Sequence, residues 1–245
     1  LELEHVSGNG IRDVSFKLHR GEILGFGGLV GAGRTELMHL IYGAAKRTSG
    51  VIKLDGKPVR FASPTEATKA GIGLIPEDRK FQGCFIDKPI KWNDSISSLD
   101  RVVSGGIFLN SKKEKDLALE YKRILKLKAA SVNHPVNSLS GGNQQKVVIA
   151  KALAALPDIL IFDEPTRGID VGARYEIYCL MADILRMGKS ILMVSSDMAE
   201  LIGMSERIIV LREGQMAGEL TPDQYDQERI LALASGVPYN PKKGP

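Results

Sequence analysis

The sequence predicts an α/β fold: a mostly parallel sheet, an antiparallel β part at the N-terminus and an inserted lobe of helices. Three observations lead to it. In the C-terminal half, short apolar runs alternate with helical patterns, which is typical of a doubly wound parallel sheet. The first sixty residues instead alternate apolar and polar side chains. Helical patterns then occupy residues 78–156, between two predicted strands.

At the N-terminus, residues 1–7 and 11–19 each read as a half-buried strand. Residues 51–61 predict two short strands around Asp55-Gly56, a strong hairpin turn. Between them, the run EILGF (22–26) is apolar enough for a strand that is buried on both faces. This strand leads into a glycine-rich loop.

Four further apolar runs follow, and helical patterns separate the last three. The predicted strands are 72–76, 158–165, 190–196 and 207–215, and the helices between them are 172–187 and 197–206. In the lobe, we expect helices at 111–128 and 142–156. The first of these places Leu117, Tyr121, Ile124 and Leu125 on one face.

Composition restricts the classes of function. The 245 residues are 43% hydrophobic, enough for one large domain with a lobe inserted in it. A formal net charge of +4 is too small to argue for nucleic acid. No run is apolar and long enough for a membrane helix, and no signal peptide is visible. We expect Cys84 and Cys179 to be reduced and buried. Since the chain lacks an initial Met, we expect a fragment of a longer protein.

The glycine-rich loop GLVGAGRTEL (28–37) is a candidate phosphate site. Gly28, Gly31 and Gly33 would let backbone N–H groups face phosphate oxygens, and the following helix adds its positive dipole. Thr35 offers a hydroxyl for Mg²⁺. Arg34, however, stands where such loops carry lysine. Taken alone, the loop is equally well a tight strand-to-helix turn.

Two more segments carry candidate chemistry. ILIFDEPT (159–166) places Asp163 and Glu164 at the carboxyl end of a predicted strand, where ligands of open α/β sheets gather. Asp163 suits a water-mediated Mg²⁺ ligand, and Glu164 a base for an attacking water. Two solvated acids before a proline turn are the alternative. LSGG (139–142) offers a hydroxyl and free N–H groups to an anion, although Ser140 is equally well an ordinary helix cap.

The order of these motifs makes the chain resemble the ATP-binding-cassette (ABC) ATPases over nearly its whole length. The matching segments are GLVGAGRT, IGLIPED, LSGGNQQK, ILIFDEPT, RGID and ILMVSSD. The chain is most similar to the second cassette of the fused ATPases of bacterial monosaccharide importers of the ribose, galactose and xylose type. The resemblance implies a single ABC domain with a P-loop NTPase, RecA-like sheet. Its parts are a nucleotide-binding core (1–77 and 157–220), a signature lobe (78–156), and a C-terminal helix and tail (221–245).

The resemblance also implies ATP and Mg²⁺ as cofactors, with each ATP held between the P-loop of one cassette and the signature of the other. The implied nucleotide-binding residues are Gly28, Leu29, Val30, Gly31, Ala32, Gly33, Arg34, Thr35, Glu36, Ser140, Gly141, Gly142, Asn143 and Asp170, the last in a loop that crosses to the partner. The implied Mg²⁺ ligands are Thr35, Asp163 and Glu77, and the implied catalytic residues are Glu164, Glu77 and Ser196.

The implied partners are a first cassette in the same full-length chain or a homodimer mate, a membrane permease and, indirectly, a sugar-binding protein. The implied location is the cytoplasmic face of the bacterial inner membrane, with no role for nucleic acid. Within residues 77–96, Phe81, Phe85, Ile86 and Trp92 either form the permease surface or pack the lobe's own core.

The sequence departs from the family pattern at four motif positions. Arg34 replaces a lysine, Glu77 a glutamine, Ser196 a histidine and Asn143 a glutamine, and residues 5–14 lack the usual aromatic residue for stacking on adenine. A planar guanidinium does not fit a slot shaped for an ammonium group, and serine cannot replace a proton-shuttling histidine. We therefore expect slow or absent hydrolysis at this P-loop, while LSGG serves the partner's ATP. One hypothesis is that Arg34 and Glu77 lie together and compensate.

Two other functions remain open on the sequence alone. The first is a regulatory cassette that binds nucleotide without turnover of its own, which the changes at Arg34, Glu77 and Ser196 favour. The second is a soluble, non-transport ABC ATPase that works on nucleic acid or ribosomes. The modest charge and the short helical lobe count against the second.

Overall fold

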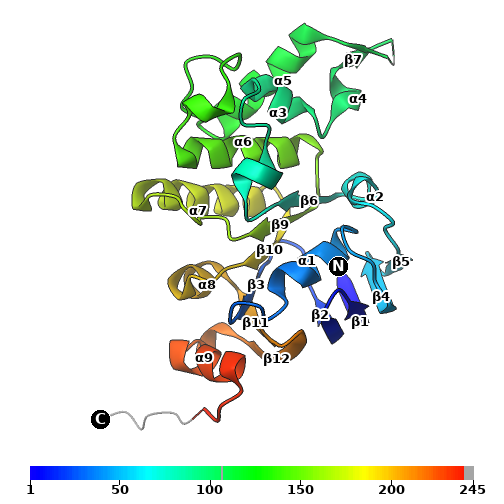
Figure 1. Ribbon diagram of the computed structural model, residues 1–245, viewed down its shortest axis with the longest axis vertical. Helices are drawn as coiled ribbons and strands as arrows, with labels where there is room; N and C mark the ends of the chain where they lie inside the picture. Colours follow the sequence, from blue (N-terminus) through cyan, green and yellow to red (C-terminus); the bar gives the residue numbers. More distant parts are fainter. Residues whose placement is uncertain (106, 240–245) are drawn as a thin grey trace.

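The computed structural model describes residues 1–105 and 107–239, and within them the chain forms a central sheet with an antiparallel sheet beside it and a helical lobe at one end (Figure 1). The central sheet has the strand order β12-β11-β3-β10-β9-β6. Its strands are β3 (Ile23–Gly28), β6 (Ile72–Ile75), β9 (Ile159–Asp163), β10 (Ser190–Val194), β11 (Arg207–Arg212) and β12 (Gln215–Leu220).

The central sheet is parallel except at one edge. β3, β6, β9, β10 and β11 pair in parallel, whereas β12 runs antiparallel to β11. Every residue of β9 and β10 is buried, as expected for strands covered on both faces. One prediction was wrong: residues 207–215 are not a single strand. Glu213 and Gly214 have φ values of 50° and 77° and turn the chain back into β12, because such left-handed pairs make tight hairpins.

The predicted antiparallel part is confirmed as a second sheet with the order β2-β1-β4-β5. Its strands are β1 (Glu2–Gly8), β2 (Ile11–Lys17), β4 (Ser49–Leu54) and β5 (Lys57–Val59). Asp55 and Gly56 form the β4–β5 turn with φ values of 47° and 76°. Phe16 of β2 meets Phe26 of β3 edge to face, with ring centroids 5.2 Å apart, so the two sheets share one core.

Helices cover the central sheet, and others build the lobe. Those around the sheet and the C-terminal segment are α1 (Arg34–Ile41), α2 (Pro64–Lys69), α7 (Val171–Arg186), α8 (Met198–Met204), the short 3₁₀ turn η3 (Pro222–Gln224) and α9 (Gln227–Ser235). The lobe contains η1 (Arg79–Gly83), α3 (Ile90–Ser95), α4 (Leu99–Val102), α5 (Ser111–Ile124), η2 (Val136–Ser138) and α6 (Gly141–Ala154), with a small hairpin of β7 (Val103–Ser104) and β8 (Phe108–Leu109).

The lobe is joined to the core by α6, which is buried along most of its length. The helix predicted at 111–128 ends earlier, at Ile124, because Lys126 takes a left-handed φ of 50°. Leu117 and Tyr121 pack inward as expected. Both cysteines are free, but Cys179 is exposed, so the expectation that it is buried was wrong.

Residues 240–245 of the predicted C-terminal tail lie outside the described residues. No helix in the described part of the chain is both long and apolar enough to cross a bilayer.

Candidate functional site

The glycine loop, residues 28–35, joins β3 to α1. Gly28, Gly31 and Gly33 have φ values of 149°, 80° and 101°, which favour glycine. A Cβ atom on Gly28 would lie 2.5 Å from the Leu211 carbonyl oxygen, so no side chain fits there. No side chain caps α1, and Val30 at the loop tip is 95% exposed. The N–H groups of the first turn therefore face a position that an anion can reach.

Asp163 ends β9 beside this loop and is only 2% exposed. Its Oδ1 atom has no hydrogen-bond partner among the described residues. Burial raises the pKa of Asp163 to about 6, against the opposing effect of a hydrogen bond with the Thr35 side chain. A buried carboxylate with one orphaned oxygen fits a cation, so Thr35 and Asp163 are the residues that would hold Mg²⁺.

The described residues contain no cluster of three or more His, Cys, Asp or Glu side chains that could hold a metal alone. Mg²⁺ keeps waters and phosphate oxygens as ligands and takes only one or two from the protein, so Thr35 and Asp163 would suffice as its protein ligands. Glu77, the third predicted ligand, forms an ion pair with Arg167 instead.

Glu164 sits in a strained position next to Asp163. Its φ of 51° lies in the left-handed region, which costs a non-glycine residue roughly 1–3 kcal/mol and is common at functional sites. Its backbone N–H donates to the Val194 carbonyl (2.9 Å), which fixes it between β9 and β10. Ser196 Oγ donates to Glu164 Oε2 (2.9 Å), and Arg34 Nη1 lies 3.5 Å from Glu164 Oε1. We call Arg34, Glu164 and Ser196 the Glu164 clamp.

The clamp holds both oxygens of the candidate base. The side chains of Arg34 and Glu164 are only 10% and 11% exposed, so the ion pair is screened little by solvent. Arg34 Nη1 also donates to the Ser195 carbonyl (2.8 Å). Ser195 is fixed in turn, since its Oγ donates to the buried Glu200 carboxylate (2.6 Å). The guanidinium is thus held at the end of β10, and Arg34 and Ser196 each contact one of the two Glu164 oxygens.

The hypothesis that Arg34 and Glu77 lie together was wrong. Arg34 pairs with Glu164, and Glu77 pairs with Arg167. The reason is the strand order: Arg34 follows β3, Glu77 follows β6, and β10 and β9 lie between them. Three strand spacings of about 4.8 Å separate the two strand ends by about 14 Å.

The signature turn, residues 139–143, begins α6 in the lobe. Ser140 occupies the N-cap position, but its side chain makes no capping hydrogen bond. Its Oγ instead accepts a hydrogen bond from Asn143 Nδ2 (2.9 Å), and Asn143 Oδ1 accepts from the Lys128 N–H (2.8 Å). A Cβ atom on Gly142 would lie 2.5 Å from Ala173 Cβ, so this glycine allows α6 to approach α7.

The predicted residues fall into two separate groups. The glycine loop, Asp163, Glu164 and Ser196 meet at the carboxyl edge of the central sheet, whereas the signature turn lies in the lobe (Figure 1). None of the hydrogen bonds or ion pairs among the described residues joins 139–143 to 28–36. Glu36 is exposed at the loop, and Asp170 is exposed while its Oδ1 caps α7 through the Ala173 N–H (3.0 Å). The glycine loop and the signature turn are therefore two separate groups within the described part of this chain.

Arg79 is a site residue that the sequence analysis missed. Its Nη1 and Nη2 atoms donate to the carbonyls of Arg167 (3.0 Å) and Gly168 (3.2 Å), and Nε donates to Gln144 Oε1 (3.4 Å). It thereby joins the loop after β6 to the RGID loop and to the start of α6. No sequence motif indicates this role, because the hydrogen-bond partners of Arg79 lie 65 to 89 residues away in the sequence.

We expect Arg79→Met to lower the free energy of unfolding by about 1–2 kcal/mol, since charge-assisted hydrogen bonds are lost at a partly exposed site. Amide hydrogen exchange should become faster in residues 140–145 and 167–170 and stay unchanged in β3. Lys80→Met is the matched control at the exposed neighbouring position. Unchanged exchange in both segments of Arg79→Met would contradict the assignment.

Comparisons with known proteins agree with this geometry. A family model described as "ABC transporter" matches residues 11–167. The chain is 49% identical over 227 residues to a putative ribose/galactose/methyl galactoside import ATP-binding protein of Rhizobium meliloti (strain 1021), covering 93% of this chain and 45% of that protein. It is 45% identical over 237 residues to the ribose import ATP-binding protein RbsA of Geobacillus kaustophilus (strain HTA426), covering 96% and 48%. The chain thus spans about half the length of these relatives.

A third relative and a solved structure complete the comparison. The chain is 46% identical over 235 residues to the arabinose import ATP-binding protein AraG 2 of Burkholderia ambifaria, covering 96% of this chain and 45% of that protein. Among solved structures, the dimeric ATP-binding cassette MJ0796 in a post-hydrolysis state with ADP and Pi superimposes with a TM-score of 0.77. That match is 25% identical and covers 90% of this chain and 98% of the other. The α/β fold class predicted from the sequence is confirmed.

Proposed function

Because the chain belongs to the ABC transporter family as an ATP-binding cassette, we propose that it binds ATP with Mg²⁺ and couples ATP hydrolysis to the import of a monosaccharide. The observation that carries the proposal is the orphaned, buried carboxylate of Asp163 beside an uncapped glycine loop, in a chain 45–49% identical to sugar import ATP-binding proteins. The names of these relatives include ribose, galactose and arabinose, which supports a monosaccharide and leaves its identity open.

We propose further that this chain is the second cassette of a two-cassette protein. It spans 45% of a relative's length, which leaves room for another cassette of similar size. Its glycine loop and signature turn share no described hydrogen bond or ion pair. Each would therefore need residues of a second cassette to complete an ATP site. In this arrangement the turn offers Ser140, Gly141 and Gly142 to ATP on the partner's P-loop. The partner is the first cassette or, in its absence, a second copy of this chain.

The two ATP sites of such a pair would be unequal. At this chain's own P-loop, the glycine-loop N–H groups bind the phosphates, and Thr35 and Asp163 hold Mg²⁺, which neutralises phosphate charge when bound. Glu164 would orient the attacking water, but Arg34 and Ser196 hold its two oxygens. Hydrolysis there is therefore slow. The same clamp favours the alternative function, a regulatory cassette that binds nucleotide without turnover.

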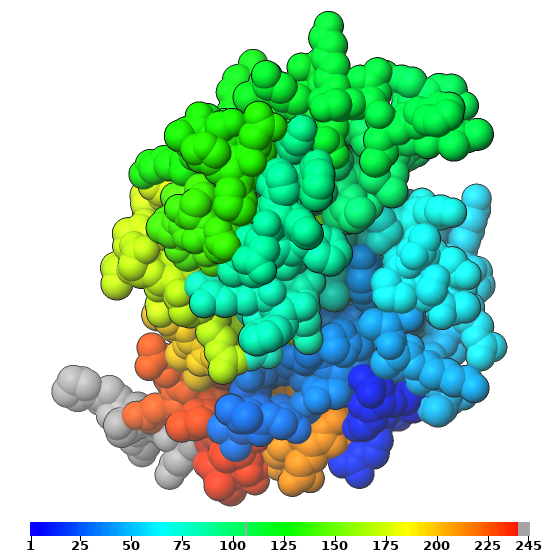
Figure 2. Space-filling model, turned by 45° about the horizontal axis from the view of Figure 1, so that its top comes forward, coloured from blue at the N-terminus to red at the C-terminus, as the bar shows by residue number. Residues whose placement is uncertain are grey.

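The permease is proposed to dock where the lobe meets the core. Phe81 is 90% exposed, and Phe85 and Trp92 are exposed beside it, which favours a partner surface over core packing for these three residues. Ile86 instead packs partly against the lobe's own core. Figure 2 shows a hollow between residues 60–70 and the lobe; Thr68 and Arg101 line it, but none of these three aromatic residues does, so the proposed docking surface is the exposed aromatic side chains themselves. Docking there would hold the cassette at the cytoplasmic face of the inner membrane, with a sugar-binding protein reached only through the permease.

The test compares this chain alone with the two-cassette protein. The isolated chain should hydrolyse ATP near background, and the first cassette should restore turnover. Gly141→Asp in the two-cassette protein should lower turnover by about 10²-fold, because an anion is added where the partner's phosphates are received. The fold can accept this change, since the atom nearest to a Cβ at Gly141 is Arg79 Nη2 at 3.0 Å, the far end of a flexible side chain.

The matched control is Gly203→Asp in α8, where a Cβ atom would meet open space. It should leave turnover unchanged. Fast turnover by the isolated chain, abolished by Glu164→Gln, would contradict the proposed inequality of the two sites. Full activity of Gly141→Asp would contradict the role of the signature turn. Co-purification with a membrane permease separates these proposals from a soluble, non-transport ATPase.

A further inference from the structure

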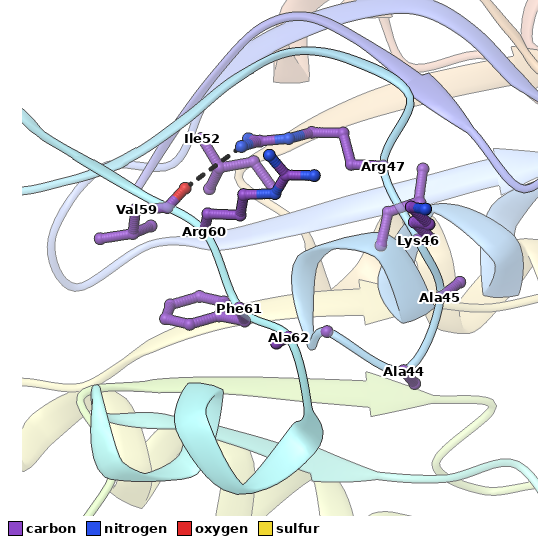
Figure 3. Close-up of a pocket in the computed structure, with 11 residues that line it drawn as sticks. Ala44, Ala45, Lys46, Arg47, Ile52, Val59, Arg60, Phe61 and Ala62 are labelled. Carbon is purple, nitrogen blue, oxygen red and sulfur yellow. Dashed lines mark hydrogen bonds between the residues drawn. The ribbon is translucent and has the colours of Figure 1, made fainter.

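A cavity of about 390 Å³ lies at the far end of α1 from the glycine loop. The segment after α1, strand β4 and the segment after β5 enclose it (Figure 3). Three basic residues line it, Lys46, Arg47 and Arg60. Ile52, Val59 and Phe61 add an apolar wall. Since α1 has eight residues, about 12 Å of helix separates this basic cavity from the glycine loop, so the two are distinct.

Among the described residues, no carboxylate forms an ion pair with the basic side chains of the cavity. None of the described ion pairs includes Lys46, Arg47 or Arg60, whereas Arg20, Arg174 and Arg207 elsewhere in the chain each pair with a carboxylate. Of the acidic residues close in the chain to the lining, Asp55 pairs with Arg20 (2.8 Å), and Glu66 accepts a hydrogen bond from the Ala62 N–H (2.8 Å). The cavity is thus a concave surface of one sign of charge.

Arg47 carries a buried hydrogen-bond donor that no described residue satisfies. Its Nη2 atom donates one long hydrogen bond to the Val59 carbonyl (3.4 Å), and its Nη1 atom is buried with no described partner. Burial, and then the positive charge of Arg60, lowers the pKa of Arg47. Figure 3 shows the Arg47 and Arg60 guanidinium groups close together, whereas the Lys46 side chain lies apart from them, beside Ala45. Two adjacent cations and a buried unsatisfied donor are unfavourable unless an anion lies between them.

We propose that the basic cavity binds the phosphate group of a small phosphorylated organic molecule. Guanidinium groups bind phosphate oxygens through paired N–H donors, and two adjacent guanidinium groups match a dianion better than a single carboxylate. The apolar wall of Ile52, Val59 and the Phe61 ring then accommodates the carbon skeleton. The backbone also fits tightly here: a Cβ atom on Gly43 would lie 2.7 Å from Phe61 Cβ, so the wall that carries Phe61 rests directly on the end of α1.

The experiment is a calorimetric titration of the full chain at fixed ionic strength with ribose 5-phosphate, inorganic phosphate and ribose. Ribose 5-phosphate should bind, and ribose should not. The affinity for ribose 5-phosphate should fall at least about tenfold in Arg47→Gln and in Arg60→Gln, because each loses a charge-assisted interaction with phosphate. The control is Lys57→Gln, a lysine of β5 that does not line the cavity, and its affinity should equal that of the wild type.

The outcomes separate a binding role from a structural one. Without ligand, Arg47→Gln should keep or raise Tm, because it removes a like-charge contact and an unsatisfied donor. A lower Tm would identify a structural arginine and overturn the proposal. If Arg47→Gln fails to fold, the exposed Arg60→Gln still tests the site. If the wild type and both arginine variants bind ribose 5-phosphate with equal affinity, the phosphate binds elsewhere, such as on the glycine loop, and the proposal is overturned. Equal affinity for inorganic phosphate and ribose 5-phosphate would overturn the assignment to an organic phosphate.

Discussion

Asp163→Asn is expected to raise Tm of the nucleotide-free protein at pH 8 and to abolish the stabilisation that Mg²⁺ and ATP give the wild type. Asp163 is buried at the end of β9 with Oδ1 unsatisfied. Burial raises its pKa from 3.8 to about 6. The ionised carboxylate therefore lowers the free energy of unfolding, and we expect a bound cation to offset this loss.

The direction of the pH dependence follows from that shift. Below pH 3.8 the carboxyl is protonated in both the folded and the unfolded protein, so it costs no stability. As pH rises through about 6, the folded protein must hold a buried charge that the unfolded chain leaves in water, and stability is lost. A shift of about two pKa units corresponds to about 3 kcal/mol above pH 6. Asparagine removes this cost, which should raise Tm by several degrees at pH 8 and by little at pH 4.

Thermal unfolding of both proteins at pH 4, 6 and 8, with and without Mg²⁺ and ATP, measures the effect. The wild type should gain several degrees from Mg²⁺ and ATP at pH 8, and less at pH 4, where Asp163 is largely protonated. Asp158→Asn is the control: Asp158 precedes the same strand, its side chain is 80% exposed, and it pairs with Lys189. A lower Tm for Asp163→Asn at pH 8, or a full response to Mg²⁺ and ATP, would contradict the cation site.

The fold was largely predictable because its signals are local. β9 and β10 are continuous apolar runs, and both are buried along their whole length. The turn at Asp55-Gly56 has the residue pair that a left-handed hairpin requires. The turn at Glu213-Gly214 has the same geometry, but the residue before glycine is a glutamate, a weaker signal than aspartate, and the strand boundary was missed.

The candidate site was predictable in its residues but not in its pairings. Glycine turns and acids at strand ends can be recognised in the sequence, since the carboxyl ends of parallel strands meet at one edge. Which charges pair depends on the strand order, and only the structure shows that β10 separates β3 from β9 while β9 lies next to β6. Arg34 therefore reaches Glu164 rather than Glu77. Arg79 and the Arg47–Arg60 pair were missed for the same reason, because their significance depends on distant backbone rather than on a motif.

The strand order also decides which double substitution should restore catalysis. Arg34→Lys with Ser196→His is expected to raise ATP hydrolysis at this chain's P-loop by about 10²-fold, the usual effect of one positioned group in a catalytic site. The lysine ends the contact of Arg34 with Glu164 Oε1 and with the Ser195 carbonyl, and its compact ammonium can reach phosphate. The histidine replaces the hydroxyl that holds Glu164 Oε2. Glu164 is then free of both clamp contacts when it orients the attacking water.

Steady-state hydrolysis by the two single variants and the double variant checks this expectation. The effects should be more than additive, since each single change leaves one Glu164 oxygen held by the other clamp residue. Ser196→Ala is the control that removes the hydroxyl without adding an imidazole, and it should give only a small increase. Glu164→Gln added to the double variant should return hydrolysis to background. A gain that survives Glu164→Gln, or single effects that simply add, would show that the clamp does not restrain the base.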